Sequence, residues 1–194
     1  MGQEMSLPPA RGRGEMSVEE ALARRRSCRA YRPDALSVEE VSQLLWAAQG
    51  VTDPGGLRAA PSAGACYPLE TYLVCAEGLF HYQPAGHRLR CLGGDDRRAR
   101  LAEACGGQGF VAQAPVTVAF SAVYARTTQH YGRRGERYVH MDAALAAANV
   151  HLQAEALGLG SVAVGAFDDR AVAGLLELPA EEDILYLVPV GRPE

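Results

Sequence analysis

Residues 24–31 read Arg-Arg-Arg-Ser-Cys-Arg-Ala-Tyr and place four arginines and one serine within six positions, directly behind a short helical pattern. A guanidinium stays charged at any working pH and offers a planar fork of donors that can bind phosphate oxygens in pairs. The segment therefore predicts a phosphate site. The alternative is a solvated, charged helix end.

Helices and strands alternate around this segment. Ser17 and Ser37 are each followed three residues later by a glutamate, the spacing of a capping box, and these motifs predict helices over about 18–26 and 38–49. Apolar runs and turn residues predict further elements. We expect strands at 69–76, 79–82, 87–91, 116–123, 161–164 and 184–190, and short helices at 95–105 and 168–177.

The two ends of the domain and its longest helix can also be predicted. Residues 1–16 are polar and glycine-rich and predict a disordered leader, which leaves residues 17–194 as a single domain.

The longest helix is expected from about Tyr138 to Leu157. Its run at 143–148 is apolar nearly all the way round, so it must be covered on every side. A sheet and a second subunit could cover it; the alternative is a fully internal helix of a monomer.

Composition excludes several classes of protein. A net charge of −4 argues against a general nucleic-acid or membrane-surface binder, and there is no apolar run of about 18 residues. The five cysteines are odd in number and lack the spacing of a zinc site, which predicts a cytoplasmic protein without a metal centre. For Cys28 and Cys66 we expect small core packing.

Two further turns accompany the arginine segment. Residues 61–70 read Pro-Ser-Ala-Gly-Ala-Cys-Tyr-Pro-Leu-Glu, and residues 158–168 read Gly-Leu-Gly-Ser-Val-Ala-Val-Gly-Ala-Phe-Asp. In this order and spacing, the three motifs resemble the nitroreductase family of FMN flavoproteins over roughly residues 17–193. The string at 61–70 is similar to the SagB-type, or thiazoline/oxazoline dehydrogenase-like, branch. That branch tends to have glycine and histidine where this chain has Ala144 and Leu145.

The resemblance implies an α+β, nitroreductase-like fold with a central mixed sheet flanked by helices and the long helix at a homodimer interface. It also implies that FMN lies in composite sites built by both subunits. The residues implied to bind FMN are Arg25, Arg26, Ser27 and Arg29 around the phosphate, ribityl chain and part of the ring, Pro61, Ser62, Ala63 and Gly64 reaching the flavin of the other subunit, Ala163, Val164, Gly165 and Ala166 beneath the isoalloxazine, and Arg192 as the basic residue beyond the last strand.

The implied activity is an FMN-dependent oxidoreductase. Hydride would pass by ping-pong kinetics from NAD(P)H, through flavin N5, to a small electrophile such as a nitroaromatic or a quinone. No catalytic side chain is expected, because the backbone near Gly165 would place an N–H close to N5. One alternative is an azoline-to-azole dehydrogenase acting on a peptide. Another is a flavin carrier or sensor without turnover.

Other polar residues have simpler interpretations. His140 and His151 are expected to be ordinary surface or interface histidines, and Gln108 to lie at a helix terminus and loop. Residues 124–138 predict a mobile basic loop at the entrance of the site.

Overall fold

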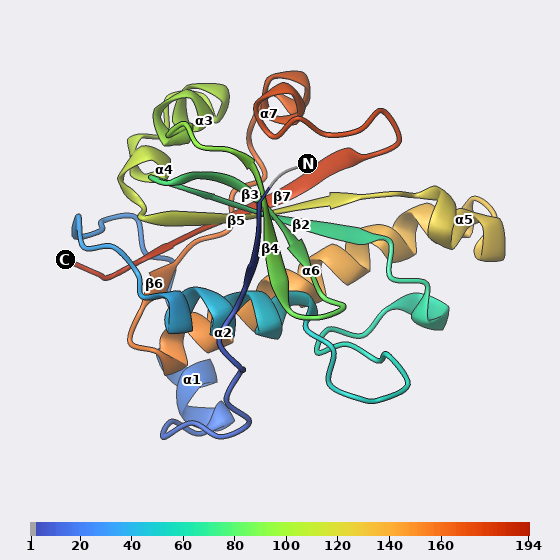
Figure 1. The fold of residues 1–194 in the computed structure, drawn as a ribbon, viewed down its shortest axis with the longest axis horizontal. Coiled ribbons are helices and arrows are strands. Elements are labelled where there is room, and N and C mark those ends of the chain that lie inside the picture. The colour runs from blue at the N-terminus through green and yellow to red at the C-terminus, as the bar shows by residue number, and fades with distance from the viewer. Residues whose placement is uncertain (1–2) are drawn as a thin grey trace.

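The computed structural model describes residues 3–194, and within them seven strands form one sheet in the order β1-β4-β3-β2-β5-β7-β6 (Figure 1). The strands are β1 (Glu4–Ser6), β2 (Leu69–Cys75), β3 (Gly78–Gln83), β4 (Arg88–Gly93), β5 (Val116–Ala122), β6 (Gly160–Ser161) and β7 (Asp183–Gly191). Neighbouring strands pair antiparallel, and parallel pairing in the described residues is limited to an isolated bridge between Ser27 and Ser161.

Helices cover both faces of the sheet, which confirms the expected α+β class (Figure 1). On one face lie α1 (Val18–Arg24), α2 (Val38–Gln49) and α6 (Arg134–Ala156); on the other lie α3 (Arg98–Ala104), α4 (Gly109–Gln113) and α7 (Asp169–Leu175). Each face has its own hydrophobic core. Every residue of β5 is buried, as its continuous apolar run predicts for a strand covered on both sides.

The long helix α6 is longer at its start than expected and is not covered on every side. Its Val139, Ala146 and Val150 are fully buried against the sheet. On the opposite side Met141 is 50% exposed and Leu145 is 44% exposed. Small side chains on the inner face let the helix approach the sheet closely, while the outer face keeps an apolar stripe open on this single chain.

The predicted loop at 124–138 is wrong, because most of it is helical. Helix α5 (Ala125–Tyr131) follows β5, and α6 begins at Arg134. Arg126 of α5 donates to a carboxylate oxygen of Glu70 and, at 3.2 Å, to the carbonyl of Tyr67, which fastens this segment to the start of β2. These contacts are long-range, so the local composition gave no sign of them.

The expected disordered leader is also wrong for the described residues 3–16. Strand β1 pairs with β4, and the Leu7 N–H donates to the His87 carbonyl at 3.1 Å. The imidazole of His87 contacts the Pro8 carbonyl at 3.1 Å and the Ser42 hydroxyl at 2.7 Å through Nε2. A polar sequence at a chain end does not imply disorder when distant residues form hydrogen bonds with its backbone N–H and carbonyl groups.

No helix within residues 3–194 has the length and apolar character needed to span a bilayer.

The imidazole of His87 should contribute measurably to stability. Its Nδ1 lies 2.8 Å from the hydroxyl of fully buried Tyr82, which would lose its partner in His87→Asn. Asparagine tolerates the positive φ of 49° at this position, so the loss reports the hydrogen bonds rather than backbone strain. We expect His87→Asn to lower the free energy of unfolding by about 1–3 kcal/mol, measured by urea denaturation.

Two controls accompany this measurement. Adding Tyr82→Phe to His87→Asn should cost little more, because the stranded hydroxyl is removed. Burial lowers the pKa of His87, so the wild-type protein loses this contribution as pH falls below about 6.5, and the gap to the variant should narrow there. If the difference in free energy of unfolding between wild type and His87→Asn stays constant or grows in acid, the role of the neutral imidazole is contradicted.

Candidate functional site

The arginine segment lies at the edge of the sheet, beside β6. Helix α1 ends at Arg24, and Arg25 leaves the helical conformation with φ −47° and ψ 121°. The extended chain then forms the bridge between Ser27 and Ser161, and the Cys28 N–H donates to the Ser161 carbonyl at 3.0 Å. The arginine segment and the motif at 158–168 are therefore adjacent in space.

The arginines of this segment differ in their partners. Arg24 pairs with Glu20 at 2.9 Å and with Glu155 at 3.4 Å. Among the described residues, no ion pair involves Arg25, Arg26 or Arg29. Three positive charges without a carboxylate are concentrated within five residues, which favours an anion as their ligand.

Two of these guanidiniums are nevertheless held in place. Arg26 donates through Nη1 to the carbonyls of Ala23, at 3.0 Å, and Arg25, at 2.7 Å. The Arg29 guanidinium lies over the Phe110 ring, 5.8 Å from its centroid. Such contacts reduce the freedom of a long side chain while leaving its charge available.

Arg192 is engaged elsewhere in this structure. Its Nη2 lies 3.0 Å and 3.1 Å from the two carboxylate oxygens of Glu40 on α2. The Arg32 N–H donates to the Arg192 carbonyl at 2.9 Å, so the backbone of Arg192 lies close to the arginine segment in space, while its charge is neutralised by Glu40. A phosphate role for Arg192 would require it to leave Glu40, and that role stays a prediction.

The third motif, residues 158–168, leaves β6 and runs beside β7. The backbone of Val164 exchanges two hydrogen bonds with Leu187, at 2.8 Å and 3.0 Å. The next residue, Gly165, is exposed, and a Cβ built on it would meet no atom closer than 3.5 Å, on Tyr186. Gln108, expected at a helix terminus and loop, is the N-cap residue of α4 and donates to the Ala166 carbonyl at 3.2 Å. The result is a fixed backbone turn with an open face.

The second motif, residues 61–70, is fastened to α6 by a buried carboxylate. The Ser62 hydroxyl donates to Asp142 at 2.6 Å and accepts from the Tyr67 N–H at 2.9 Å, while the Ala63 N–H donates to Asp142 at 3.4 Å. Burial raises the pKa of Asp142 against the opposing effect of these hydrogen bonds. Sequence reasoning missed Asp142, although a lone acidic residue in an alanine-rich helix was a usable signal.

Glycine is required at position 64. Its φ is +59°, and a Cβ there would lie 2.6 Å from the Tyr131 hydroxyl. The turn at 61–64 therefore depends both on α6, through Asp142, and on α5, through Tyr131. Neither partner is part of the arginine segment.

The three motifs do not meet within one chain. The second motif lies at Asp142, whereas the first lies near His151, nine residues later on α6 and thus about 13 Å along its axis. Figure 1 shows α1 and β6 near one end of α6, and the turn that precedes β2 nearer its other end. Residues 25–29 and 163–166 are brought together, and residues 61–64 are not.

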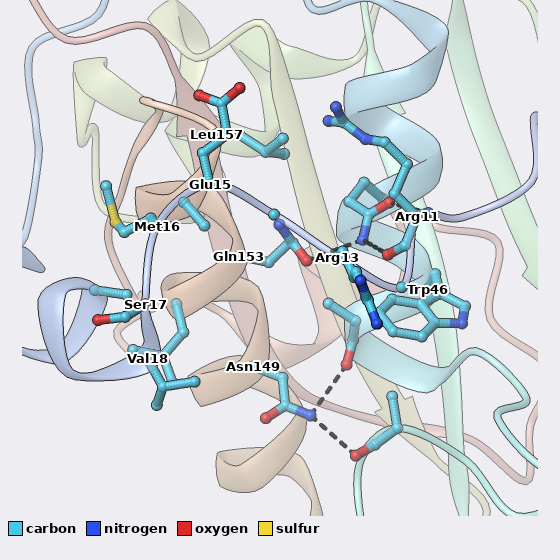
Figure 2. Close-up of a pocket in the computed structure, with 18 of the residues that line it drawn as sticks. Arg11, Arg13, Glu15, Met16, Ser17, Val18, Trp46, Asn149, Gln153 and Leu157 are labelled. Atoms are coloured by element: carbon cyan, nitrogen blue, oxygen red, sulfur yellow. Dashed lines mark hydrogen bonds between the residues drawn. The ribbon is translucent and has the colours of Figure 1, made fainter.

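A separate cavity of about 770 Å³ lies between residues 11–18, α2 and α6 (Figure 2). None of the predicted FMN-binding residues lines it. Its amides are bonded within the fold: Gln43 to Arg11 and Gln153, and Asn149 to the carbonyls of Ala47 and Ala59. We therefore do not assign a ligand to it. No group of three acidic, histidine or cysteine side chains suited to a metal occurs within residues 3–194.

The donor set beside β6 fits FMN. Unpaired guanidiniums and an exposed serine match the oxygens of a phosphomonoester. The open backbone turn at 163–166 could accept a planar ring on the same side of the sheet edge, because no side chain obstructs Gly165.

The chain is similar to known proteins over nearly its whole length. The family model described as "Nitroreductase family" matches residues 22–192. The chain is 42% identical over 195 residues to "Putative nitroreductase MJ1384" of Methanocaldococcus jannaschii, covering 97% of this chain and 96% of the relative.

Two solved structures extend the comparison. A structure from Ralstonia eutropha, also titled a putative nitroreductase, is 30% identical with a TM-score of 0.89, covering 98% of this chain and 90% of that one. The NADPH:FMN oxidoreductase of Vibrio harveyi, solved with NAD+, shares the fold at a TM-score of 0.70 and 21% identity, covering 91% of this chain and 69% of its own. By sequence and by fold, this chain belongs to the nitroreductase family.

Proposed function

We propose that this chain is an FMN-dependent oxidoreductase that passes hydride from NAD(P)H to a small electrophilic acceptor, such as a nitroaromatic or a quinone. The observation that carries the proposal is the position of three arginines without carboxylate partners in the described residues, fastened beside the open turn at 163–166. FMN, when bound, supplies reversible two-electron chemistry at its N5 atom. A structural relative from Vibrio harveyi is named for FMN and NADPH, which supports this choice.

The arginine segment would bind the phosphate and ribityl chain. Arg25, Arg26 and Arg29 supply charge, and the Ser27 hydroxyl is exposed beside them. Because Arg26 and Arg29 are already held by backbone carbonyls and by Phe110, less side-chain entropy is lost when an anion binds. These residues bind and orient the cofactor, and we assign them no step in hydride transfer.

The turn at 163–166 would support the ring. Val164 is fixed by its two hydrogen bonds to Leu187, so the backbone at Gly165 is rigid before a ligand arrives. A backbone N–H near Gly165 would donate toward N5, and the absence of a side chain there lets the ring approach. The protein's part is to orient donor and acceptor in turn over one face of the ring.

A homodimer with composite sites explains the location of the second motif. Residues 61–64 contact α6 at Asp142, about 13 Å along the helix axis from His151, which contacts the strand beside the arginine segment of the same chain. Met141 and Leu145 form an exposed apolar stripe on the same helix, which a second copy would cover. We infer that each chain contributes residues 61–64 to the site of the other.

The five cysteines are free thiols, which is typical of a reducing compartment, so we propose that the protein is cytoplasmic.

A second candidate is oxidation of an azoline ring in a peptide to an azole. It rests on the string at 61–70, which is similar to the SagB-type branch. In this structure Tyr67 and Glu70 of that string have contacts within the fold, since Tyr67 accepts from the Arg58 N–H at 3.1 Å and Glu70 pairs with His81 at 2.8 Å. Incubation with a thiazoline-bearing peptide, followed by mass spectrometry for loss of two hydrogens, distinguishes this activity from acceptor reduction.

Arg25→Gln should weaken FMN binding selectively. Loss of one charge-assisted contact costs about 1.5–3 kcal/mol, so we expect the Kd for FMN to rise about 10- to 150-fold, measured by flavin fluorescence. Riboflavin, which has no phosphate, should bind both proteins equally. Arg24→Gln is the matched control, because Arg24 already pairs with Glu20 and Glu155. Equal losses in the two variants would argue against the phosphate site.

Steady-state kinetics test the activity itself. The donor should reduce the bound flavin before the acceptor enters, since both would use one face of the ring at a single site. We expect parallel double-reciprocal lines when NADH or NADPH is varied at several acceptor concentrations, and rapid loss of the flavin absorbance on anaerobic addition of the donor alone. Intersecting lines would contradict the ping-pong order, and a flavin that stays oxidised would indicate a carrier or sensor.

A further inference from the structure

His151 links the long helix to the strand that holds the arginine segment. The residue lies on α6, half-buried, with its Nδ1 2.7 Å from the Ser161 hydroxyl. The carbonyl of the same Ser161 accepts the Cys28 N–H at 3.0 Å, and Ser161 bridges Ser27. A single titratable side chain therefore contacts the residue on which the arginine segment is fastened. His151 is thus more than the ordinary surface or interface histidine expected from the sequence.

We propose that His151 is a positioning residue for a phosphomonoester bound at residues 25–29, and that it takes up a proton when the phosphate binds. This inference rests on the proposed function in assuming that FMN is the ester. It goes beyond that function in assigning a role to His151 and a pH dependence to cofactor affinity.

The charges around His151 come from each element that packs near it. Arg25, which follows α1, is the charge that acts on His151, and Glu155 lies one turn farther along α6 and pairs with Arg24. Strand β6 adds one neutral group, the hydroxyl of Ser161. Of these cations, Arg25 has no carboxylate partner among the described residues, and it directly disfavours a charged imidazole.

The direction of the proton movement follows from these charges. Burial and the nearby Arg25 charge lower the pKa of His151, so the imidazole is neutral near pH 7 without a ligand. A phosphomonoester loses its second proton near pH 6 and arrives mostly as a dianion. Its negative charge at Arg25 offsets the cation and favours the imidazolium, whose Nδ1–H can donate to the Ser161 hydroxyl.

Calorimetry of FMN binding to the flavin-free, full-length protein tests the proposal. Titrations near pH 7 in two phosphate-free buffers of different ionisation enthalpy give the number of protons taken up. We expect net uptake with FMN and none with riboflavin. The Kd for FMN should rise about three- to tenfold between about pH 6.5 and pH 8, because the bound state loses the imidazolium charge.

Matched variants separate proton linkage from simple packing. His151→Asn can keep a hydrogen bond to Ser161 but cannot titrate, so uptake should vanish and the Kd should change less than about twofold over the same range. Ser161→Ala should keep the uptake while weakening FMN about two- to tenfold. His140→Asn, on an exposed histidine of the same helix, should behave as wild type. A merely structural His151 would instead weaken FMN and riboflavin alike.

The proposal is overturned if proton uptake on FMN binding persists in His151→Asn, or if the wild-type protein takes up no proton. If FMN does not bind at all, the proposed function fails, and His151 is then judged separately. An NMR titration of its ring protons with and without inorganic phosphate decides that case: a pKa raised by phosphate supports the role of His151, and an unchanged pKa rejects it.

Discussion

The candidate site depends on one backbone pairing at the edge of the sheet, where the Cys28 N–H donates to the Ser161 carbonyl at 3.0 Å. Strand β6 is two residues long and uses its other side to pair with β7, so it joins the arginine segment to the central sheet. A Cβ on Gly160 would lie 2.6 Å from the Cys28 Cβ, which is why glycine is needed for the approach. Without this pairing, the guanidiniums and the turn at 163–166 would not share one side of the protein.

Helix α6 sets the distance between the remaining parts. Asp142 holds the turn at 61–64 near the middle of the helix, and His151 contacts Ser161, beside the arginine segment, nearer the C-terminal end. The helix keeps Asp142 and His151 about 13 Å apart along its axis, and in the proposed dimer each chain supplies one part of each site. The apolar stripe at Met141 and Leu145, beside Asp142 on the same helix, is where a second copy would complete the proposed sites. The proposed dimer therefore follows from the positions at which the two parts of the site contact α6.

Local chemistry made much of the fold predictable. Ser37 and Glu40 form both hydrogen bonds of a capping box, and the strand at 116–122 is buried on both faces as its apolar run indicates. Features built from distant residues were not predictable. The bonds of His87 to Pro8, of Asp142 to Ser62 and of Arg192 to Glu40 join positions 79 to 152 residues apart, and no short motif encodes them. The arginine segment and the two turns were found because each is a continuous string.

The most direct test of the composite site is complementation between two variant chains that each bind FMN weakly as homodimers. Arg25→Gln damages the phosphate end, and Gly64→Val disturbs the turn that needs a positive φ and closely approaches Tyr131. A heterodimer purified with two different tags would contain one site with both lesions and one site with neither. If the flavin is shared between protomers, the heterodimer binds FMN at wild-type affinity in half of its sites, although neither homodimer does. Absence of any wild-type site in a folded heterodimer would contradict the account.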